Sequence, residues 1–269
     1  MRSSATSTRM PAVAGTFYPA DAVELAASVD GFIDAAAYEG RAPKALVVPH
    51  AGYAYSGPIA GTGYATLSAA RSTIRRVVLL GPAHRARVDS LAVPRTDTFL
   101  TPLGPVGIDT SARDDALALP GILADDAAHA LEHSIEVHLP FLQRALDDFV
   151  LLPLAVGNPA TDAVADVLDA LWGGPETLVV VSTDLSHYLD YALAAERDLR
   201  TARAVTALDT EGIGDRDACG AYALRGLLQV AGERGLEARL LDLRSSGDTA
   251  GPRDRVVGYG AFGFWEAGS

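Results

Sequence analysis

The sequence predicts an α/β fold, a single domain with a mainly parallel central sheet flanked by helices. Short runs of β-branched and leucine residues lack polar alternation, which is typical of strands buried on both faces. Helix-length amphipathic stretches separate these runs, so strand and helix alternate along most of the chain. Nothing resembling a linker interrupts the 269 residues. We therefore expect one domain over residues 1–269.

The expected elements follow one another in a regular order. Five buried strands are predicted at residues 45–50, 75–84, 149–156, 177–184 and 238–246. Amphipathic helices are predicted at residues 22–36, 134–147, 161–172, 191–208 and 218–233. The stretch 90–108 interrupts the alternation, and its Pro and Thr content indicates a hairpin or an edge excursion. Residues 255–265 are predicted to form a closing strand.

Composition excludes several classes of protein. The chain has 22 basic and 34 acidic residues, a formal net charge of −12, which argues against nucleic-acid binding. The single cysteine, Cys219, excludes a disulfide scaffold and suits a reducing compartment. No apolar run reaches the ~20 residues that cross a bilayer, and the N-terminus lacks the pattern of a secretion signal. We expect a cytoplasmic protein without membrane association.

Chemistry-bearing side chains follow four of the predicted strands. His50 follows the first strand, His84 the second, Asp184 and His187 the fourth, and Asp248 the fifth. Ligands of open α/β sheets gather beyond the carboxyl ends of the strands. Singly, such a histidine is usually a hydrogen-bonded loop residue, and each aspartate is usually a helix cap or a turn residue. Their joint occurrence at one edge favours a functional site.

These residue types match metal chemistry. Two histidines and one carboxylate with open positions hold non-haem iron(II), and His50, His84 and Asp248 could supply that set. The same ligands with a bound water suit a catalytic zinc ion, and ligand type alone does not separate the two metals. Asp184 and His187, three residues apart, are expected to act as an acid/base pair beside the metal.

A second histidine cluster lies within residues 131–146. His133 and His138 are five residues apart, about 140° around a helix, so both cannot face one metal. This stretch is either a helix cap with solvated charges, or it directs His133 into the site to orient a substrate. Tyr53 and Tyr55, close to His50, are candidates for the lining of a substrate pocket, although tyrosines at such positions are commonly packing residues. Cys219 begins an apolar helix and is expected to be a small buried packing residue.

Several blocks of sequence together resemble one known family. They are GTFYPAD at 15–21, VPHAGYAYSG at 48–57, LGPAH at 80–84, EHSIEVHLPFLQ at 132–143, STDLSH at 182–187, CGA at 219–221 and RSSGD at 244–248. In this order they resemble the Memo family, and they span nearly the whole chain. The resemblance implies the fold of the class III extradiol dioxygenases, which use non-haem iron(II) at the rim of an α/β sheet.

The resemblance also implies roles for individual residues. It assigns His50, His84 and Asp248 to the metal pocket and Asp184 and His187 to further pocket positions. Prokaryotic members are grouped with a radical-SAM protein, which implies a functional association with such a partner. A family fold does not fix a reaction, so the substrate is left open.

The sequence thus supports three hypotheses. The first is a dioxygenase-like oxidoreductase with iron(II), or alternatively copper or zinc, in which His187 and Asp184 move protons and His133 orients the substrate. The second is a protein that binds a peptide or a small metabolite in the same pocket without turnover. The third is a zinc-dependent hydrolase.

Overall fold

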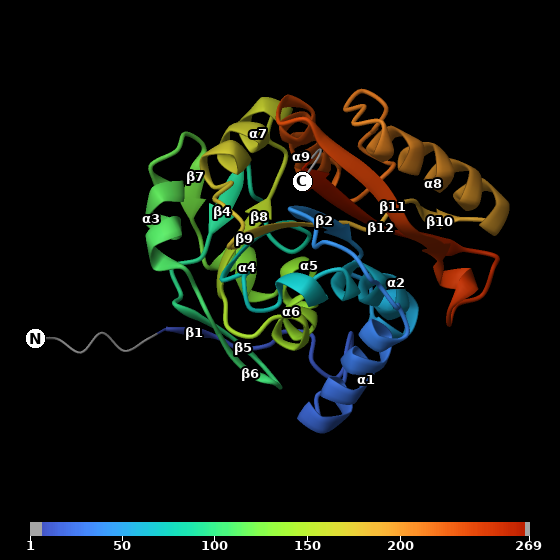
Figure 1. Ribbon diagram of the computed structural model, residues 1–269, viewed down its shortest axis with the longest axis horizontal. Helices are drawn as coiled ribbons and strands as arrows, with labels where there is room; N and C mark the ends of the chain where they lie inside the picture. The colour runs from blue at the N-terminus through green and yellow to red at the C-terminus, as the bar shows by residue number, and fades with distance from the viewer. Residues whose placement is uncertain (1–6, 267–269) are drawn as a thin grey trace, which may run out of the picture.

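The computed structural model describes residues 7–266 and shows a mixed nine-stranded sheet between helices (Figure 1). Four neighbouring strands at its centre are parallel. In spatial order they are β2 (Ala45–Val48), β9 (Thr177–Ser182), β3 (Arg76–Pro82) and β8 (Val150–Val156). Every residue of β2 and β9 is buried, which explains why these runs show no polar alternation. The predicted α/β class and its parallel core are confirmed.

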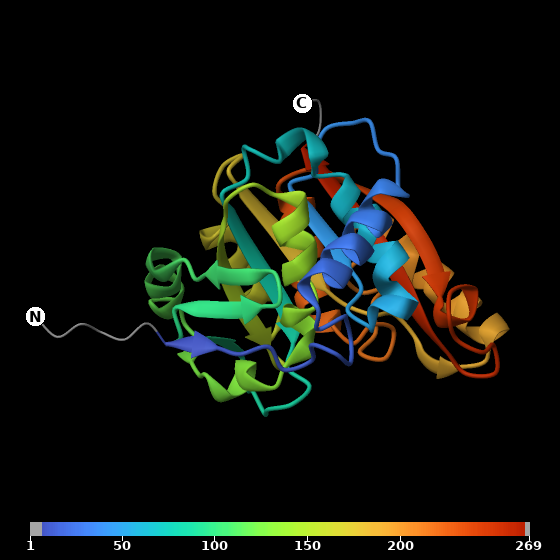
Figure 2. The ribbon, with the colours of Figure 1, turned by 90° about the horizontal axis from the view of Figure 1, so that it is seen from below.

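Antiparallel strands extend both sides of this core. Beyond β8 lie β4 (Leu91–Val93), which is antiparallel to β8, and β7 (Ile122–Ala124), which is parallel to β4. Beyond β2 lies the long β12 (Val256–Glu266), which is antiparallel to β2, to β11 (Leu236–Ser245) and to β10 (His187–Leu189). The closing strand is therefore where the sequence places it. The predicted hairpin is β5 (Thr98–Thr101) and β6 (Gly104–Gly107), which forms a small separate sheet with β1 (Thr8–Arg9) (Figure 2).

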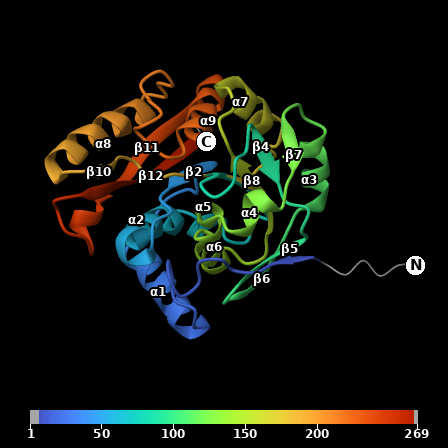
Figure 3. The ribbon, with the colours of Figure 1, turned by 180° about the vertical axis from the view of Figure 1, so that it is seen from behind.

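Helices cover both faces of the large sheet (Figures 1 and 3). Alternate residues of each central strand point to opposite faces, so Leu46 and Val48 pack in one core while Ala45 and Val47 pack in the other. The first core includes α1 (Ala22–Asp34), α2 (Tyr53–Ala65) and α6 (Leu139–Ala145). The second includes α3 (Thr110–Leu117), α7 (Thr161–Ala170), α8 (Tyr191–Thr206) and α9 (Ala221–Glu233). No helix among residues 7–266 is both long and apolar enough to span a bilayer.

Several helical regions differ from the sequence expectation, among them α3, which lies outside every predicted helix. Helix α2 was not predicted, because it contains Pro58 and several glycines that disfavour a helix. Close packing explains one glycine, since a Cβ on Gly61 would lie 2.5 Å from the carbonyl oxygen of Phe32. The helix predicted at 134–147 is instead two short helices, α5 (His133–Glu136) and α6, with Pro140 in the first turn of α6. A further short helix, α4 (Ala127–Ala130), precedes them.

Candidate metal centre

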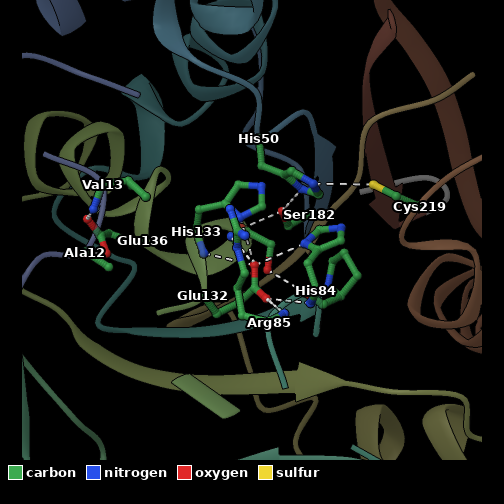
Figure 4. Close-up of polar contacts among 12 residues, drawn as sticks. Ala12, Val13, His50, His84, Arg85, Glu132, His133, Glu136, Ser182 and Cys219 are labelled. Carbon is green, nitrogen blue, oxygen red and sulfur yellow. Dashed lines mark hydrogen bonds and ion pairs between the residues drawn. The ribbon is translucent and has the colours of Figure 1, made fainter. Parts of the chain in front are cut away.

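Three histidines meet at the carboxyl edge of the parallel strands. His50 follows β2 by two residues, His84 follows β3 by two, and His133 begins α5. Their ring centroids are 5.3 Å (His50–His84), 5.4 Å (His50–His133) and 4.9 Å (His84–His133) apart. One nitrogen from each ring lies within 4.8 Å of the others, and these rings form the only group of potential metal ligands found in residues 7–266. Figure 4 shows the rings gathered around a common centre.

A buried glutamate holds two of these rings. Glu132 is the N-cap of α5, and its Oε1 lies 3.1 Å from Nδ1 of both His84 and His133. The same carboxylate accepts hydrogen bonds from the backbone N–H groups of His133, Ser134, His84 and Arg85. Burial raises the pKa of Glu132, but the bonds from His133 and His84 outweigh it and hold that pKa well below its usual range. Glu132 is therefore an anion, which can only accept the hydrogen bond from Nδ1 of His84.

A serine holds the third ring. Nδ1 of His50 lies 2.6 Å from Ser182 Oγ, and the Ser182 hydroxyl donates to the backbone carbonyl of Ser134 at 2.6 Å. A hydroxyl has one proton, and a carbonyl cannot supply another, so the proton of the His50–Ser182 bond belongs to Nδ1. Burial, with the neighbouring His84 and His133, holds the pKa of His50 well below 6.5. The ring is thus neutral, and its lone pair is on Nε2.

Two partners, Ser182 and Glu132, leave one nitrogen of each ring for a metal. Nδ1 of His50 is bonded to Ser182 and Nδ1 of His84 to Glu132, so Nε2 is the ligand atom of these two rings, whereas Nδ1 of His133 lies 3.1 Å from Glu132 without a hydrogen bond. The His50 residue is only 2% exposed, whereas the His84 and His133 side chains are 31% and 14% exposed. The centre is therefore open to solvent on the side of His84 and His133. A three-histidine set with an open side is suited to a divalent transition metal.

Cys219 lies at this centre, and sequence reasoning missed it. Its Sγ is 3.3 Å from Nε2 of His50 and 3.3 Å from the backbone N of Asp184 (Figure 4). Burial raises the pKa of the thiol to about 12, so it is protonated and can donate to the His50 lone pair. The CGA block of the family resemblance was the signal that could have found it. The interpretation of Cys219 as a packing residue overlooked the proximity of the start of α9 to the end of β9.

Asp184 and His187 occupy different environments. Asp184 Oδ1 accepts the backbone N–H of His50 at 2.8 Å, so its carboxylate lies beside the centre. Burial raises the pKa of Asp184, while the His50 N–H bond and the nearby His187 lower it. His187 is exposed at the start of β10, and its Nδ1 lies 2.8 Å from the carbonyl of Leu185. No hydrogen bond between the Asp184 and His187 side chains is found in residues 7–266.

Asp248 is not brought into the histidine group. It ends a short 3₁₀ turn, η2 (Ser246–Asp248), in which its Oδ2 accepts from the backbone and side chain of Ser245. Its Oδ1 accepts from Tyr191 at 2.6 Å and from Arg253 at 3.3 Å. β12 separates the preceding strand, β11, from β2, so the end of β11 is displaced from the ends of the central strands. The turn interpretation of RSSGD describes this environment.

The two tyrosines near His50 also separate. Tyr53 is buried, and its hydroxyl donates to the carbonyl of Val137, while its ring packs 5.0 Å from Phe141. Tyr55 is exposed. Phe17, which the sequence analysis did not single out, lies against the centre with its ring 4.7 Å from that of His133. Phe17 belongs to the GTFYPAD block, so the resemblance contained that signal as well.

Comparison with known proteins assigns the family. Residues 9–262 match the family model described as Memo-like protein. The chain belongs to the Memo family. MEMO1 family proteins of Methanopyrus kandleri and Aquifex aeolicus are both 36% identical to it, over 95% and 93% of this chain and 98% and 97% of theirs. A MEMO1 family protein of Ignicoccus hospitalis is 34% identical over 95% of this chain and 98% of its own length.

A solved structure supports the fold of this Memo-family chain. The uncharacterized protein JW3007 of Escherichia coli aligns with a TM-score of 0.50 over 81% of this chain and 99% of its own. Its sequence identity is 18%, so the likeness concerns the fold alone.

Proposed function

We propose that the chain is a metal-dependent enzyme whose ion binds Nε2 of His50, His84 and His133. The observation that supports this is the convergence of the three rings on one point, with Nδ1 of His50 bonded to Ser182 and Nδ1 of His84 bonded to Glu132, so that the Nε2 atoms of these two rings are left as ligands. His133 thereby takes the ligand position expected of Asp248, and Cys219 is a candidate additional donor because its sulfur contacts His50. When bound, the metal would act as a Lewis acid or a redox centre for a small substrate.

The residues around the centre have distinct tasks in this proposal. The negative charge of Glu132 would offset part of the positive charge of a bound metal. The same carboxylate lies against the rings of His84 and His133 and orients them. Asp184, beside His50, is the group that would hold or pass a proton, with His187 as a more exposed partner. The Phe17 ring covers part of His133, whose side chain is 14% exposed. A substrate would enter on the open side, next to His84.

Iron(II), with an oxidoreductase reaction of the dioxygenase type, is the first candidate. Zinc, with a hydrolytic reaction, is the second, and the three-histidine donor set suits it because catalytic zinc often has this set with a bound water. Imidazole also suits copper, and a thiol next to the rings would increase affinity for soft metals.

Metal analysis tests the proposal. We expect protein purified without chelator to contain about one transition metal per chain, and a His50→Ala/His84→Ala double variant to contain none. Equal metal content in the two proteins would overturn the proposal. Oxygen uptake with catechol-type substrates by the iron-loaded protein supports the first candidate, and ester hydrolysis by the zinc-loaded protein supports the second.

A further inference from the structure

A hydrogen-bonded series of buried polar groups leads from His50 at the candidate metal centre into the core. The proposed reaction does not use this series. Beyond His50, Ser182 Oγ also lies 2.8 Å from Nε2 of His138, and Nδ1 of His138 lies 3.0 Å from the Tyr64 hydroxyl. Ser182, His138 and Tyr64 are at most 1% exposed. His138 is the second histidine of the cluster that the sequence analysis singled out, and it turns away from the metal to reach Ser182.

Counting protons fixes the direction of each bond. The only hydroxyl proton of Ser182 is donated to Ser134, so both histidines must donate to Ser182 Oγ, His50 through Nδ1 and His138 through Nε2. Burial lowers the pKa of His138 to about 3, which keeps this ring neutral. Its Nδ1 therefore carries a lone pair and accepts the Tyr64 proton. The donor and the acceptor of each hydrogen bond in this series are thereby fixed.

This series of buried polar groups does not reach solvent. Tyr64 is 1% exposed, and its ring stacks 5.1 Å from that of Phe141 in the core between the sheet and α6. A path for protons would need an exit, so this arrangement suits orientation rather than proton transport.

We propose that His138 is a positioning residue for the metal centre. By donating to Ser182, it occupies the second lone pair of the hydroxyl and keeps the hydroxyl proton directed at Ser134. His50 can then only donate to Ser182, which keeps its Nε2 lone pair free for the metal. Without His138, the Ser182 hydroxyl is free to rotate and donate to His50 Nδ1, which allows the tautomer whose Nε2 carries the proton. The consequence for metal binding depends on the proposed function, whereas the effect on the tautomer does not.

The tautomer of His50 is measured by ¹⁵N NMR of the metal-free protein. We expect the wild-type ring to be protonated on Nδ1, and the His138→Leu variant to show a mixture of both tautomers. His138→Gln retains a side-chain donor and an acceptor, so we expect it to restore the wild-type spectrum. His129→Leu is the matched control. His129 is also a buried histidine, but its Nε2 bonds to the carbonyl of Ala92 and is not part of this series of polar groups.

Zinc affinity, measured by competition with a chromophoric chelator, is the second readout. We expect His138→Leu to bind Zn²⁺ about tenfold more weakly than wild type, with His138→Gln and His129→Leu within about twofold of it. If His138→Leu fails to fold, Tyr64→Phe removes only the hydroxyl, and we expect a smaller shift in the same direction. An unchanged His50 tautomer in the folded His138 or Tyr64 variant overturns the inference. A wild-type protein that binds no metal overturns the proposed function and leaves the tautomer measurement valid.

Discussion

The two edges of the parallel sheet hold buried polar clusters of opposite character. At the carboxyl edge, three histidines each bring one ring nitrogen to within 4.8 Å of the others. At the amino edge, the ammonium of Lys44 donates to the carbonyls of Trp172, Gly174 and Thr177 at 2.6 to 2.7 Å. Lys44 is the only lysine in a chain with 21 arginines. A compact ammonium fits three converging carbonyls, whereas a planar guanidinium does not.

The difference separates a cluster that could hold a metal ion from one whose polar atoms are all used within the protein. Lys44 lies at the edge of a cavity of about 530 Å³, yet its three donors are all used within the protein. His50 contacts Ser182 through Nδ1 and Cys219 through Nε2, whereas no hydrogen bond to Nε2 of His84 or His133 is found in residues 7–266. Within residues 7–266, ring nitrogens that converge on one point, rather than cavity size, mark the cluster that could hold a metal ion.

Replacing Lys44 should lower the stability of the amino edge of the sheet without affecting the histidine cluster at the carboxyl edge. We expect Lys44→Met to lower the free energy of unfolding by about 3 kcal/mol, because it leaves buried carbonyls without donors. The metal content of the folded variant should stay at the wild-type level. Urea denaturation and metal analysis of the same preparation check both statements. A loss of metal from a folded Lys44→Met protein would show that the two edges are not independent.

Replacing the Glu132 carboxylate should lower metal affinity at the carboxyl edge. We expect Glu132→Gln to reduce metal affinity about 10- to 100-fold, since a neutral amide orients His84 and His133 less strongly than a carboxylate. Chelator competition measures the affinity. Glu136→Gln is the matched control, because Glu136 is a buried carboxylate bonded to Arg9 and Tyr18 instead of the histidines. It should lower stability and leave the affinity of the folded protein unchanged. Similar affinities in both variants would refute the role of Glu132.

Acid should destabilise the metal-free protein through its buried neutral histidines. Burial lowers the pKa of His129 to about 4 and that of His138 to about 3, whereas both titrate near 6.5 when unfolded. The unfolded state therefore binds more protons below pH 6.5, and stability falls as the pH falls. Each histidine contributes a loss of about 2 kcal/mol between pH 6.5 and pH 5. Thermal unfolding across this range tests the slope, which should be shallower in His129→Leu; an identical slope would contradict it.

The smallest effect is expected at Asp248. Its carboxylate caps η2 and bonds to Tyr191, so we expect Asp248→Asn to lower the free energy of unfolding by less than about 1 kcal/mol. Chemical denaturation measures this change. A loss of several kcal/mol would indicate that the η2 turn has a larger role in stability than its exposed position suggests.

The sequence allowed the fold and part of the site to be predicted. Strand ends are visible in apolar runs, so His50, His84 and Asp184 were correctly placed at one edge. The spatial order of strands is not visible in the sequence, and the position of β11 beyond β12 displaced Asp248. The contributions of Cys219 and Glu132 depend on tertiary contacts across 169 and 48 residues, which no local pattern encodes.

The most direct test compares the metal content of His133→Ala with that of Asp248→Ala, both purified without chelator. The structure predicts that Asp248→Ala keeps about one transition metal per chain, while His133→Ala loses it. The reverse result, an empty Asp248→Ala protein and a loaded His133→Ala protein, would contradict the three-histidine centre.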